Sequence, residues 1–244
     1  MTYYAFSGLI NGLISTVVGL FVYVRNPKDI RNRTFGLLCV GLAVWSYFYL
    51  LWRITPDGRL ALLYVRGLMA GAIFIPVFSL HHVLAVLNRI DEKKKVLLAG
   101  YIVSSLFFIS NFTPFFVKDI APSRLIFQNW PNPGPLFHPY LVMFFAIFFY
   151  FMFLLLQAYR SPSKVVKKQA MYLLIAFSTG YSGGSTNFPL WYGIPIYPVG
   201  NILVAVHVAI IGYAIVKYHR IDISVVMETG LTYAVLICLI MVPN

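Results

Sequence analysis

Acidic side chains are scarce in this sequence. Its 244 residues include 7 Asp and Glu against 19 Lys and Arg, which gives a formal net charge of +12. Charged residues of either sign make up 11% of the chain, whereas about 25% is usual in a soluble domain. Hydrophobic residues make up 60%. A chain of this composition is expected to lie in a lipid bilayer.

The long apolar runs contain no Asp, Glu or Lys, and this absence argues against several classes of membrane protein. A retinal pigment is excluded because it needs a Schiff-base lysine in the middle of a span. A proton or ion pump is disfavoured because it needs acidic residues in the membrane. The chain also lacks a paired carboxylate, a Ser/His/Asp constellation and a glycine-rich phosphate loop. We therefore predict no catalytic residue and no cofactor.

Cysteine is rare as well. Cys39 lies near one end of the second apolar run, and Cys238 lies in the last one. Neither position favours a disulfide, and no metal-binding spacing surrounds either residue.

The apolar runs predict seven transmembrane helices, because a single span needs about 20 apolar residues. Helices are expected rather than barrel strands, because the runs lack strict alternation. The predicted fold class is all-α, a polytopic transmembrane helical bundle. The expected spans are residues 4–24, 34–54, 60–87, 96–113, 139–159, 170–188 and 197–216.

The chain divides into a bundle and a short continuation. Residues 1–220 are predicted to form the seven-span bundle, and residues 221–230 a cytoplasmic connecting helix or linker. A further apolar run begins at Leu231, so residues 231–244 predict the start of an eighth helix that this sequence truncates. No signal peptide is expected, because basic residues follow the first run rather than precede it.

Most basic residues gather in the loops after spans 1, 3, 5 and 7, at 25–33, 89–95, 160–168 and 217–220. Short basic loops stay on the cytoplasmic side, so the N-terminus is predicted to lie outside. The positive charge is therefore interpreted as a topology signal that also contacts anionic lipid, and not as a nucleic-acid surface.

Arg66 is the one charged residue expected well inside a span. It lies about 9 Å below the outer end of the third span, at about 1.5 Å per residue. Two interpretations stay open. The side chain either extends to the outer interface or faces the bundle interior, where an anionic ligand, water or backbone carbonyls satisfy it.

Three histidines, His81, His82 and His207, lie within the expected spans. Adjacent histidines on a helix diverge by about 100°, so they do not easily face one metal ion. Hydrogen bonds between helices are the favoured interpretation. An intramembrane metal-dependent enzyme that uses these three residues is a less favoured alternative, and no metal site is predicted.

The segment 183–201, GGSTNFPLWYGIPIYPVGN, differs from the apolar runs around it. Its prolines end one helix and set the start of the next, because proline lacks an amide hydrogen and clashes with the preceding turn. Non-helical backbone at membrane depth is tolerated where it lines a cavity or is buried in protein. The segment therefore predicts an outer hairpin with a binding pocket; a hairpin shaped only for stability is the alternative.

The other long outer loop, 114–138, is turn-rich and places Trp130 at the expected level of the outer headgroups. At the opposite end of the bundle, residues 213–227 contain no Gly or Pro, so a helix is able to continue from the seventh span into the cytoplasm. Such an exit would transmit motion, and a frayed helix end is the alternative. The predicted relay residues are Tyr213, Lys217, Tyr218 and Asp222.

Several stretches carry a family resemblance. The strongest is 183–201, and the others are Asn32-Arg33-Thr34-Phe35, Trp45-Ser46, 130–137, 213–218 and Asp222-Ile223. Together they resemble the N-terminal seven-transmembrane sensor region of bacterial histidine kinases. The family's usual Tyr-Arg-Leu-Met-Asp stands here as residues 218–222, YHRID, with arginine at an apolar position.

The resemblance implies a membrane sensory input module in the bacterial cytoplasmic membrane, with no enzymatic activity of its own. It would detect a small or lipophilic cue on the outer side and pass the signal through the seventh span to a cytoplasmic kinase or other output domain of the same chain. The expected partners are a small-molecule or lipid ligand, membrane lipid and a second copy in a homodimer, with no nucleic acid. A small-molecule transporter or channel is the alternative.

The sensing pocket is predicted on the outer side of the bundle. Arg66 would anchor the cue, and Trp45 would form the floor of the pocket. The expected remaining members are Asn187, Trp191, Tyr197 and Asn201. Trp191 and Tyr197 are also expected, with Tyr192, to anchor the hairpin at the membrane interface.

Overall fold

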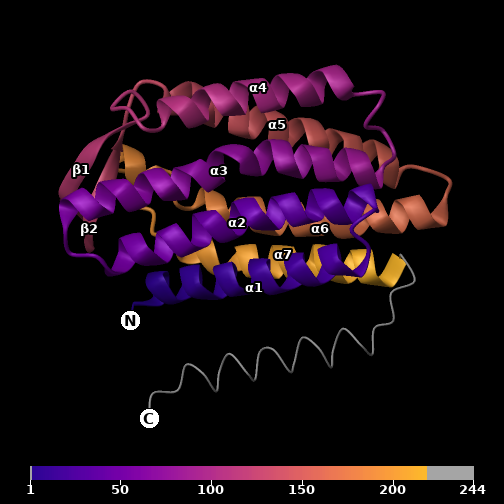
Figure 1. The fold of residues 1–244 in the computed structure, drawn as a ribbon, viewed down its shortest axis with the longest axis horizontal. Coiled ribbons are helices and arrows are strands. Elements are labelled where there is room, and N and C mark those ends of the chain that lie inside the picture. Colours follow the sequence, from indigo (N-terminus) through magenta and orange to yellow (C-terminus); the bar gives the residue numbers. More distant parts are fainter. Residues whose placement is uncertain (1, 219–244) are drawn as a thin grey trace, which may run out of the picture.

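The computed structural model of the chain describes residues 2–218, which form helices, one β hairpin and two short 3₁₀ helices (Figure 1). The α helices are α1 (Tyr3–Arg25), α2 (Ile30–Ile54), α3 (Gly58–Val86), α4 (Lys94–Ser110), α5 (Phe137–Tyr159), α6 (Lys164–Ser185) and α7 (Leu203–Tyr218). The remaining elements are β1 (Val117–Arg124), β2 (Phe127–Pro133), η1 (Pro189–Tyr192) and η2 (Val199–Ile202). The predicted segments 221–230 and 231–244 lie outside the described residues.

Six of the described helices form a closed ring. Each of α1, α2, α3, α5, α6 and α7 packs against the next in this order, and α7 packs back against α1. α4 lies outside the ring against α3, at the top of Figure 1. The ring brings the first and last described helices side by side and encloses a space that α2, α3, α5, α6 and α7 share.

Each of the seven expected spans corresponds to one of these helices, and the chain is mostly helical as predicted. Five helical segments are long and apolar enough by themselves to cross a membrane, namely 3–25, 30–54, 58–86, 137–159 and 199–217. α4 has only 17 residues, and α6 begins with several lysines and ends in Ser-Gly-Gly-Ser. The number of seven complete spans therefore stays a prediction.

The all-α prediction missed the β hairpin. β1 and β2 pair antiparallel within the expected outer loop and are joined by Leu125 and Ile126. β2 was not predicted because it contains prolines and asparagines. These residues are rare in central strands but tolerated in a two-stranded edge hairpin. Trp130, expected at the level of the outer headgroups, is fully buried in the protein and therefore has no surface with which to contact them.

The hairpin closes one end of the ring through hydrogen bonds to helix ends. The indole Nε1 of Trp52 on α2 donates to the Asn129 carbonyl over 2.8 Å. Arg124 on β1 donates to the carbonyls of Leu190 and Trp191 on η1 over 2.9 and 3.0 Å. Backbone carbonyls that would otherwise face lipid or water thus have partners, and the hairpin is fixed to both halves of the ring.

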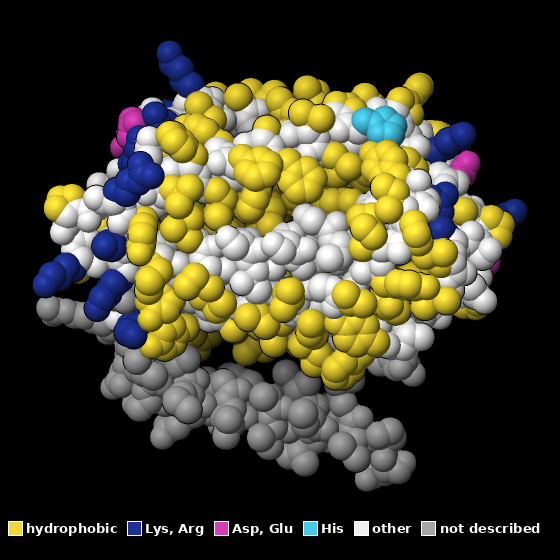
Figure 2. All heavy atoms as spheres, turned by 180° about the vertical axis from the view of Figure 1, so that it is seen from behind, with side chains coloured by type: hydrophobic (Ala, Val, Ile, Leu, Met, Phe, Trp, Pro, Cys, Tyr) yellow, Lys and Arg dark blue, Asp and Glu magenta, His cyan; other side chains and the backbone are white. Residues whose placement is uncertain are grey.

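The flank of the bundle and its ends differ in charge. Figure 2 shows apolar side chains over the flank, with Lys and Arg atoms gathered mainly at the left end. At this end the carboxylate of Glu92 contacts Arg89 and Lys93. These hydrogen bonds, first that of Arg89, lower the pKa of Glu92 to about 2, so this carboxylate stays ionised at neutral pH.

α3 contains Pro76 near its middle, and another helix compensates for the break. Proline has no N–H, so the carbonyl of Ala72 one turn earlier loses its usual helical donor. The buried hydroxyl of Tyr140 on α5 donates to this carbonyl over 3.3 Å. The side chain of α5 therefore replaces a backbone hydrogen bond of α3 and joins the two helices.

This arrangement predicts a coupling between the two residues. Tyr140→Phe should lower the free energy of unfolding by about 0.5–1.5 kcal/mol, because the Ala72 carbonyl then lacks a donor. In a Pro76→Ala background the new amide supplies that donor, and Tyr140→Phe should cost clearly less. A double-mutant cycle of the purified protein, unfolded by SDS and followed by circular dichroism, measures the difference. Equal costs in the two backgrounds would contradict the interpretation.

Candidate ligand cavity

A cavity lies inside the ring, beneath the β hairpin. It comprises about 740 Å³ of atom-free space, including space that is open to the outside, and about 70 Å³ can hold the centre of a water molecule. A site for one water needs roughly 10–15 Å³ by that second measure, so this cavity has room for several waters or a small molecule. Its lining comes from five helices, from β2 and from the segment after α6.

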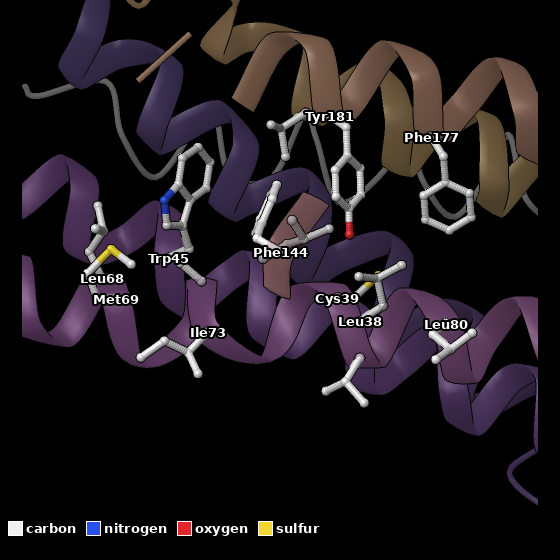
Figure 3. Packing of buried hydrophobic residues seen from close by; sticks show 14 of the residues in the cluster. Leu38, Cys39, Trp45, Leu68, Met69, Ile73, Leu80, Phe144, Phe177 and Tyr181 are labelled. Atoms are coloured by element: carbon white, nitrogen blue, oxygen red, sulfur yellow. The ribbon is translucent and has the colours of Figure 1, made fainter. Parts of the chain in front are cut away.

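Aromatic side chains form most of the wall. Trp45, Tyr49 and Trp52 line it from α2 at three- and four-residue spacing, which places them on one face of the helix. Phe144 and Tyr181 face them from α5 and α6, with ring centroids 5.1 Å apart. Figure 3 shows Trp45, Phe144 and Tyr181 projecting into the space between the helices. Such a wall is able to hold an apolar or aromatic molecule.

Three of the lining residues carry a buried polar atom without a hydrogen-bond partner among the described residues. These atoms are the hydroxyl of Tyr49, the indole Nε1 of Trp130 and the amide Oδ1 of Asn187. A buried polar group without a partner costs about 1–3 kcal/mol. A ligand that brings a donor and an acceptor into the cavity would remove part of this cost after small side-chain rotations.

An asparagine cluster supports the cavity from behind. The side chain of Asn201 accepts from the Asn187 amide over 3.1 Å and donates to the Ser7 hydroxyl over 2.8 Å. Asn11 on α1 donates to the Asn201 carbonyl over 2.8 Å and accepts from the backbone amide of Ala205 over 3.0 Å. The cluster thus caps the first turn of α7, whose amides have no partner within the helix, and fixes it to α1.

The structure brings some of the predicted pocket residues together. Trp45, Asn187 and Trp191 line the cavity, and Asn201 contacts Asn187 from behind the wall. Tyr197 lies elsewhere: its ring is partly exposed and contacts Phe127 at 6.0 Å between centroids.

The segment 183–201 contains η1 and most of η2, with an irregular stretch between them. α6 ends at Ser185 and α7 begins at Leu203, so the part without α helix is longer than the expected spans allowed. The expectation that Trp191 anchors this segment at the interface is wrong. Its ring is 4% exposed and stacks on Phe137 with centroids 4.2 Å apart, so it is part of the packed interior.

Arg66 does not line the cavity. Its side chain is half-buried on α3, and its Nε is buried without a hydrogen-bond partner among the described residues. Its backbone carbonyl accepts from the Asn111 amide of the segment after α4, over 2.7 Å. The role of Arg66 as an anchor stays a prediction, and the geometry gives it no contact with the aromatic wall.

The histidines make hydrogen bonds between helices, as favoured from the sequence. His207 Nδ1 on α7 lies 2.8 Å from the Ala176 carbonyl on α6, and His81 Nδ1 lies 2.8 Å from the Tyr101 hydroxyl on α4. His207 also lines the cavity, which the sequence analysis missed. Among residues 2–218, no three His, Cys, Asp or Glu side chains form a group that could hold a metal ion.

At the other end of α7, two of the predicted relay residues contact each other. The ammonium group of Lys217 donates to the Tyr213 hydroxyl over 2.9 Å and to the Tyr172 hydroxyl of α6 over 3.4 Å. α7 is thereby joined to α6 at this end as well as at the cavity. Tyr218 is the last residue of α7, and Asp222 lies outside the described residues.

The comparisons with known proteins give one match. The family model described as the N-terminal 7TM region of histidine kinase matches residues 8–224, which is most of the chain. No curated protein and no solved structure matches this sequence.

The asparagine cluster yields a prediction about stability. Asn11→Leu should lower the free energy of unfolding by about 1–3 kcal/mol, because the Ala205 amide and the Asn201 carbonyl both lose a buried partner. Thr16→Val on the same helix is the control, since its hydroxyl bonds only its own helix and the Tyr47 hydroxyl at an exposed position. SDS unfolding followed by circular dichroism compares them, and equal losses would contradict the role of Asn11.

Proposed function

Since the chain belongs to the family of N-terminal 7TM regions of histidine kinases, it is a membrane sensory module, and we propose that the central cavity binds its cue. We further propose that α7 carries the resulting change out of the bundle to a kinase output domain. The single observation that carries the proposal is the aromatic cavity at the centre of the ring, part of whose wall belongs to α7 itself.

The lining defines the chemical class of the cue. It consists mainly of aromatic and aliphatic side chains, with one amide and a few hydroxyl, indole and imidazole groups, and it contains no Asp, Glu, Lys or Arg. A charged molecule would lose its hydration there without gaining an ionic partner. We infer a small, uncharged and mostly apolar molecule with one or two polar atoms that reach Asn187, Tyr49 or Trp130.

α7 is placed to respond to the occupant. Val204 and His207 line the cavity from its first turns, and the same helix continues without interruption to Tyr218. A Cβ on Gly180 of α6 would lie 2.6 Å from the His207 ring, so α6 and α7 touch closely at this level. An occupant that moves His207 would therefore move α7 against α6, because a packed contact of this kind does not deform continuously.

A filled cavity tests the binding proposal. A Cβ added to Gly184 meets only the Val204 side chain, at 3.9 Å, so Gly184→Leu places its side chain in the cavity at little cost. We expect a small molecule to co-purify with the wild-type protein after gentle extraction from membranes, and Gly184→Leu to lose at least about nine-tenths of it, as a blocked site would. Native and denaturing mass spectrometry measure the retained molecule.

Two controls define the result. Gly36→Leu makes the same change at a position of α2 that does not line the cavity, and it should retain the molecule. Arg66→Ala should also retain it, because Arg66 does not line the cavity. Loss in Arg66→Ala together with retention in Gly184→Leu would move the binding site to Arg66 and contradict our assignment.

The relay proposal has a separate readout. Spin labels on cysteines introduced at Lys94 and at the exposed Ala209, with Cys39 and Cys238 replaced by alanine, report the distance from α7 to the start of α4 by pulsed electron paramagnetic resonance. We expect the mean distance to differ by about 1–2 Å or more between the occupied wild type and the empty Gly184→Leu variant, the usual size of a helix shift. Identical distance distributions would contradict the role of α7.

A further inference from the structure

A second hollow lies on the outside of the ring, between α1 and α2. It is an open groove with about 1010 Å³ of atom-free space, of which about 500 Å³ can hold the centre of a water molecule. Its lining comes only from residues 15–23 of α1 and 33–43 of α2. None of the lining residues is shared with the central cavity, so the groove is a separate feature.

Small side chains make the groove. Gly19 and Cys39 meet so closely that a Cβ on Gly19 would lie 2.4 Å from the Cys39 Cβ, which brings α1 and α2 together at its base. Leu20 and Val40 stand on the two rims and are 60% and 59% exposed. The result is an apolar channel that runs along the two helices and opens to the side, where lipid surrounds a membrane helix.

The length of the groove fits one leaflet. Ser15 and Tyr23 are eight residues apart on α1, about 12 Å at the rise of an α helix. Half of a typical hydrocarbon core is about 15 Å thick. At the deep end Thr16 hydrogen-bonds to the Tyr47 hydroxyl of α2 over 3.0 Å. An acyl chain that enters from the basic end therefore has room for most of its length inside the bilayer.

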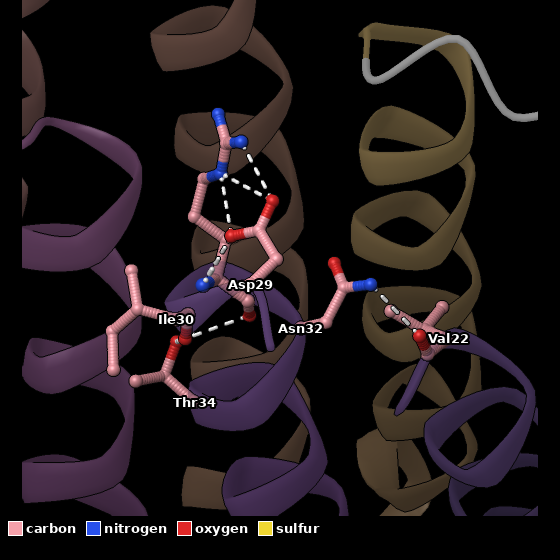
Figure 4. A network of polar contacts seen from close by, with 6 residues as sticks. Val22, Asp29, Ile30, Asn32 and Thr34 are labelled. Atoms are coloured by element: carbon pink, nitrogen blue, oxygen red, sulfur yellow. Dashed lines mark hydrogen bonds and ion pairs between the residues drawn. The ribbon is translucent and has the colours of Figure 1, made fainter. Parts of the chain in front are cut away.

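The end of the groove beside the α1–α2 turn carries an unneutralised positive charge. Asp29 on this turn holds Arg31 through three hydrogen bonds, and Asn32 donates to the Val22 carbonyl over 2.9 Å (Figure 4). Arg33 forms no ion pair with any described residue, and its side chain is exposed at the mouth of the groove. Arg25 and Lys28 on the same turn are exposed as well and add to its positive potential.

We propose that this groove binds an anionic phospholipid, with one acyl chain between α1 and α2 and the headgroup phosphate against Arg33. The combination of an apolar channel, one leaflet in length, with a free arginine at its mouth matches both parts of such a lipid. A second copy of this chain fits less well. A parallel two-fold pair through the groove would bring the basic turns of both copies side by side, and like charges repel.

Native mass spectrometry of the purified chain in detergent tests the proposal, with dioleoyl phosphatidylglycerol and dioleoyl phosphatidylcholine added in competition. We expect the wild type to prefer phosphatidylglycerol about fivefold, the effect of one well-placed cation. Arg33→Gln should reduce this preference to near onefold. Arg160→Gln removes an exposed arginine that follows the last residue of α5 and does not line the groove, and it should leave the preference unchanged.

Filling the groove tests the acyl chain separately. A Cβ on Gly36 lies 3.6 Å from the Tyr23 ring, an ordinary contact, so Gly36→Leu fills the groove without displacing the backbone. Val40→Trp fills it from a position one turn further along α2 and serves as a second variant. Both should lose retention of phosphatidylglycerol at least about fivefold, while Gly184→Leu, which fills the central cavity, should retain it.

Two results would overturn the proposal. The first is an unchanged lipid preference in Arg33→Gln. The second is unchanged retention in both groove variants together with a shift from dimer to monomer, which would make the groove an interface between two copies. The melting temperature of each variant, measured by intrinsic fluorescence, shows that the compared proteins are folded.

Discussion

The structure depends on one constraint: a backbone group inside a membrane needs a partner within the protein, because lipid offers none. Regular helices meet it by themselves, and every break in a helix has to meet it through a side chain. Tyr140 supplies the donor that Pro76 removes, and Asn32 donates to a carbonyl in the last turn of α1. Tyr140 and Asn32 thus supply partners to backbone groups at places where a helix breaks or ends.

The asparagine cluster shows how this constraint also creates a site. The segment between α6 and α7 contains only two short 3₁₀ helices and coil, so many of its backbone groups and the first amides of α7 need partners outside an α helix. Asn11 and Asn201 provide them from behind, and the ring of helices stays wide enough for a cavity in front.

Much of the fold follows from the sequence, because length, apolarity and the position of charges determine where a helix can lie. Helix bounds near 183–201 were less predictable, since prolines mark a break without showing how far unwinding extends. The β hairpin was not predicted because its strands are rich in proline, asparagine and charged residues. Its stability comes from partners such as Trp52 and η1, which are distant in sequence.

The sequence predicted which region of the chain forms the candidate site, but only some of the residues that line it. Aromatic residues and asparagines near a proline-rich turn indicated a pocket. Three of the residues named for it, Trp45, Asn187 and Trp191, line the cavity. Arg66 was predicted in the pocket because it is a lone charge within a span. Whether a helical residue faces the interior, however, depends on which neighbours the helix packs against, and the sequence does not show these. His207 was missed for the same reason, because its position on α7 faces the cavity only once α6 lies beside it.

The two hollows of the molecule differ in chemistry, and this difference bears on how the module would work. The inner cavity has an aromatic wall without ionic groups and shares residues with α7, so an occupant would be in direct contact with this helix. The outer groove has a cation at one end and lies between α1 and α2, away from the lining of the cavity. α1 nevertheless contacts α7 along the ring and holds its first turn through Asn11. A lipid that fixes α1 against α2 would therefore steady the surface against which α7 moves, so the occupancy of the groove would set how readily the cue shifts α7. Binding at two separate sites would then be coupled through one shared helix contact, without either ligand touching the other.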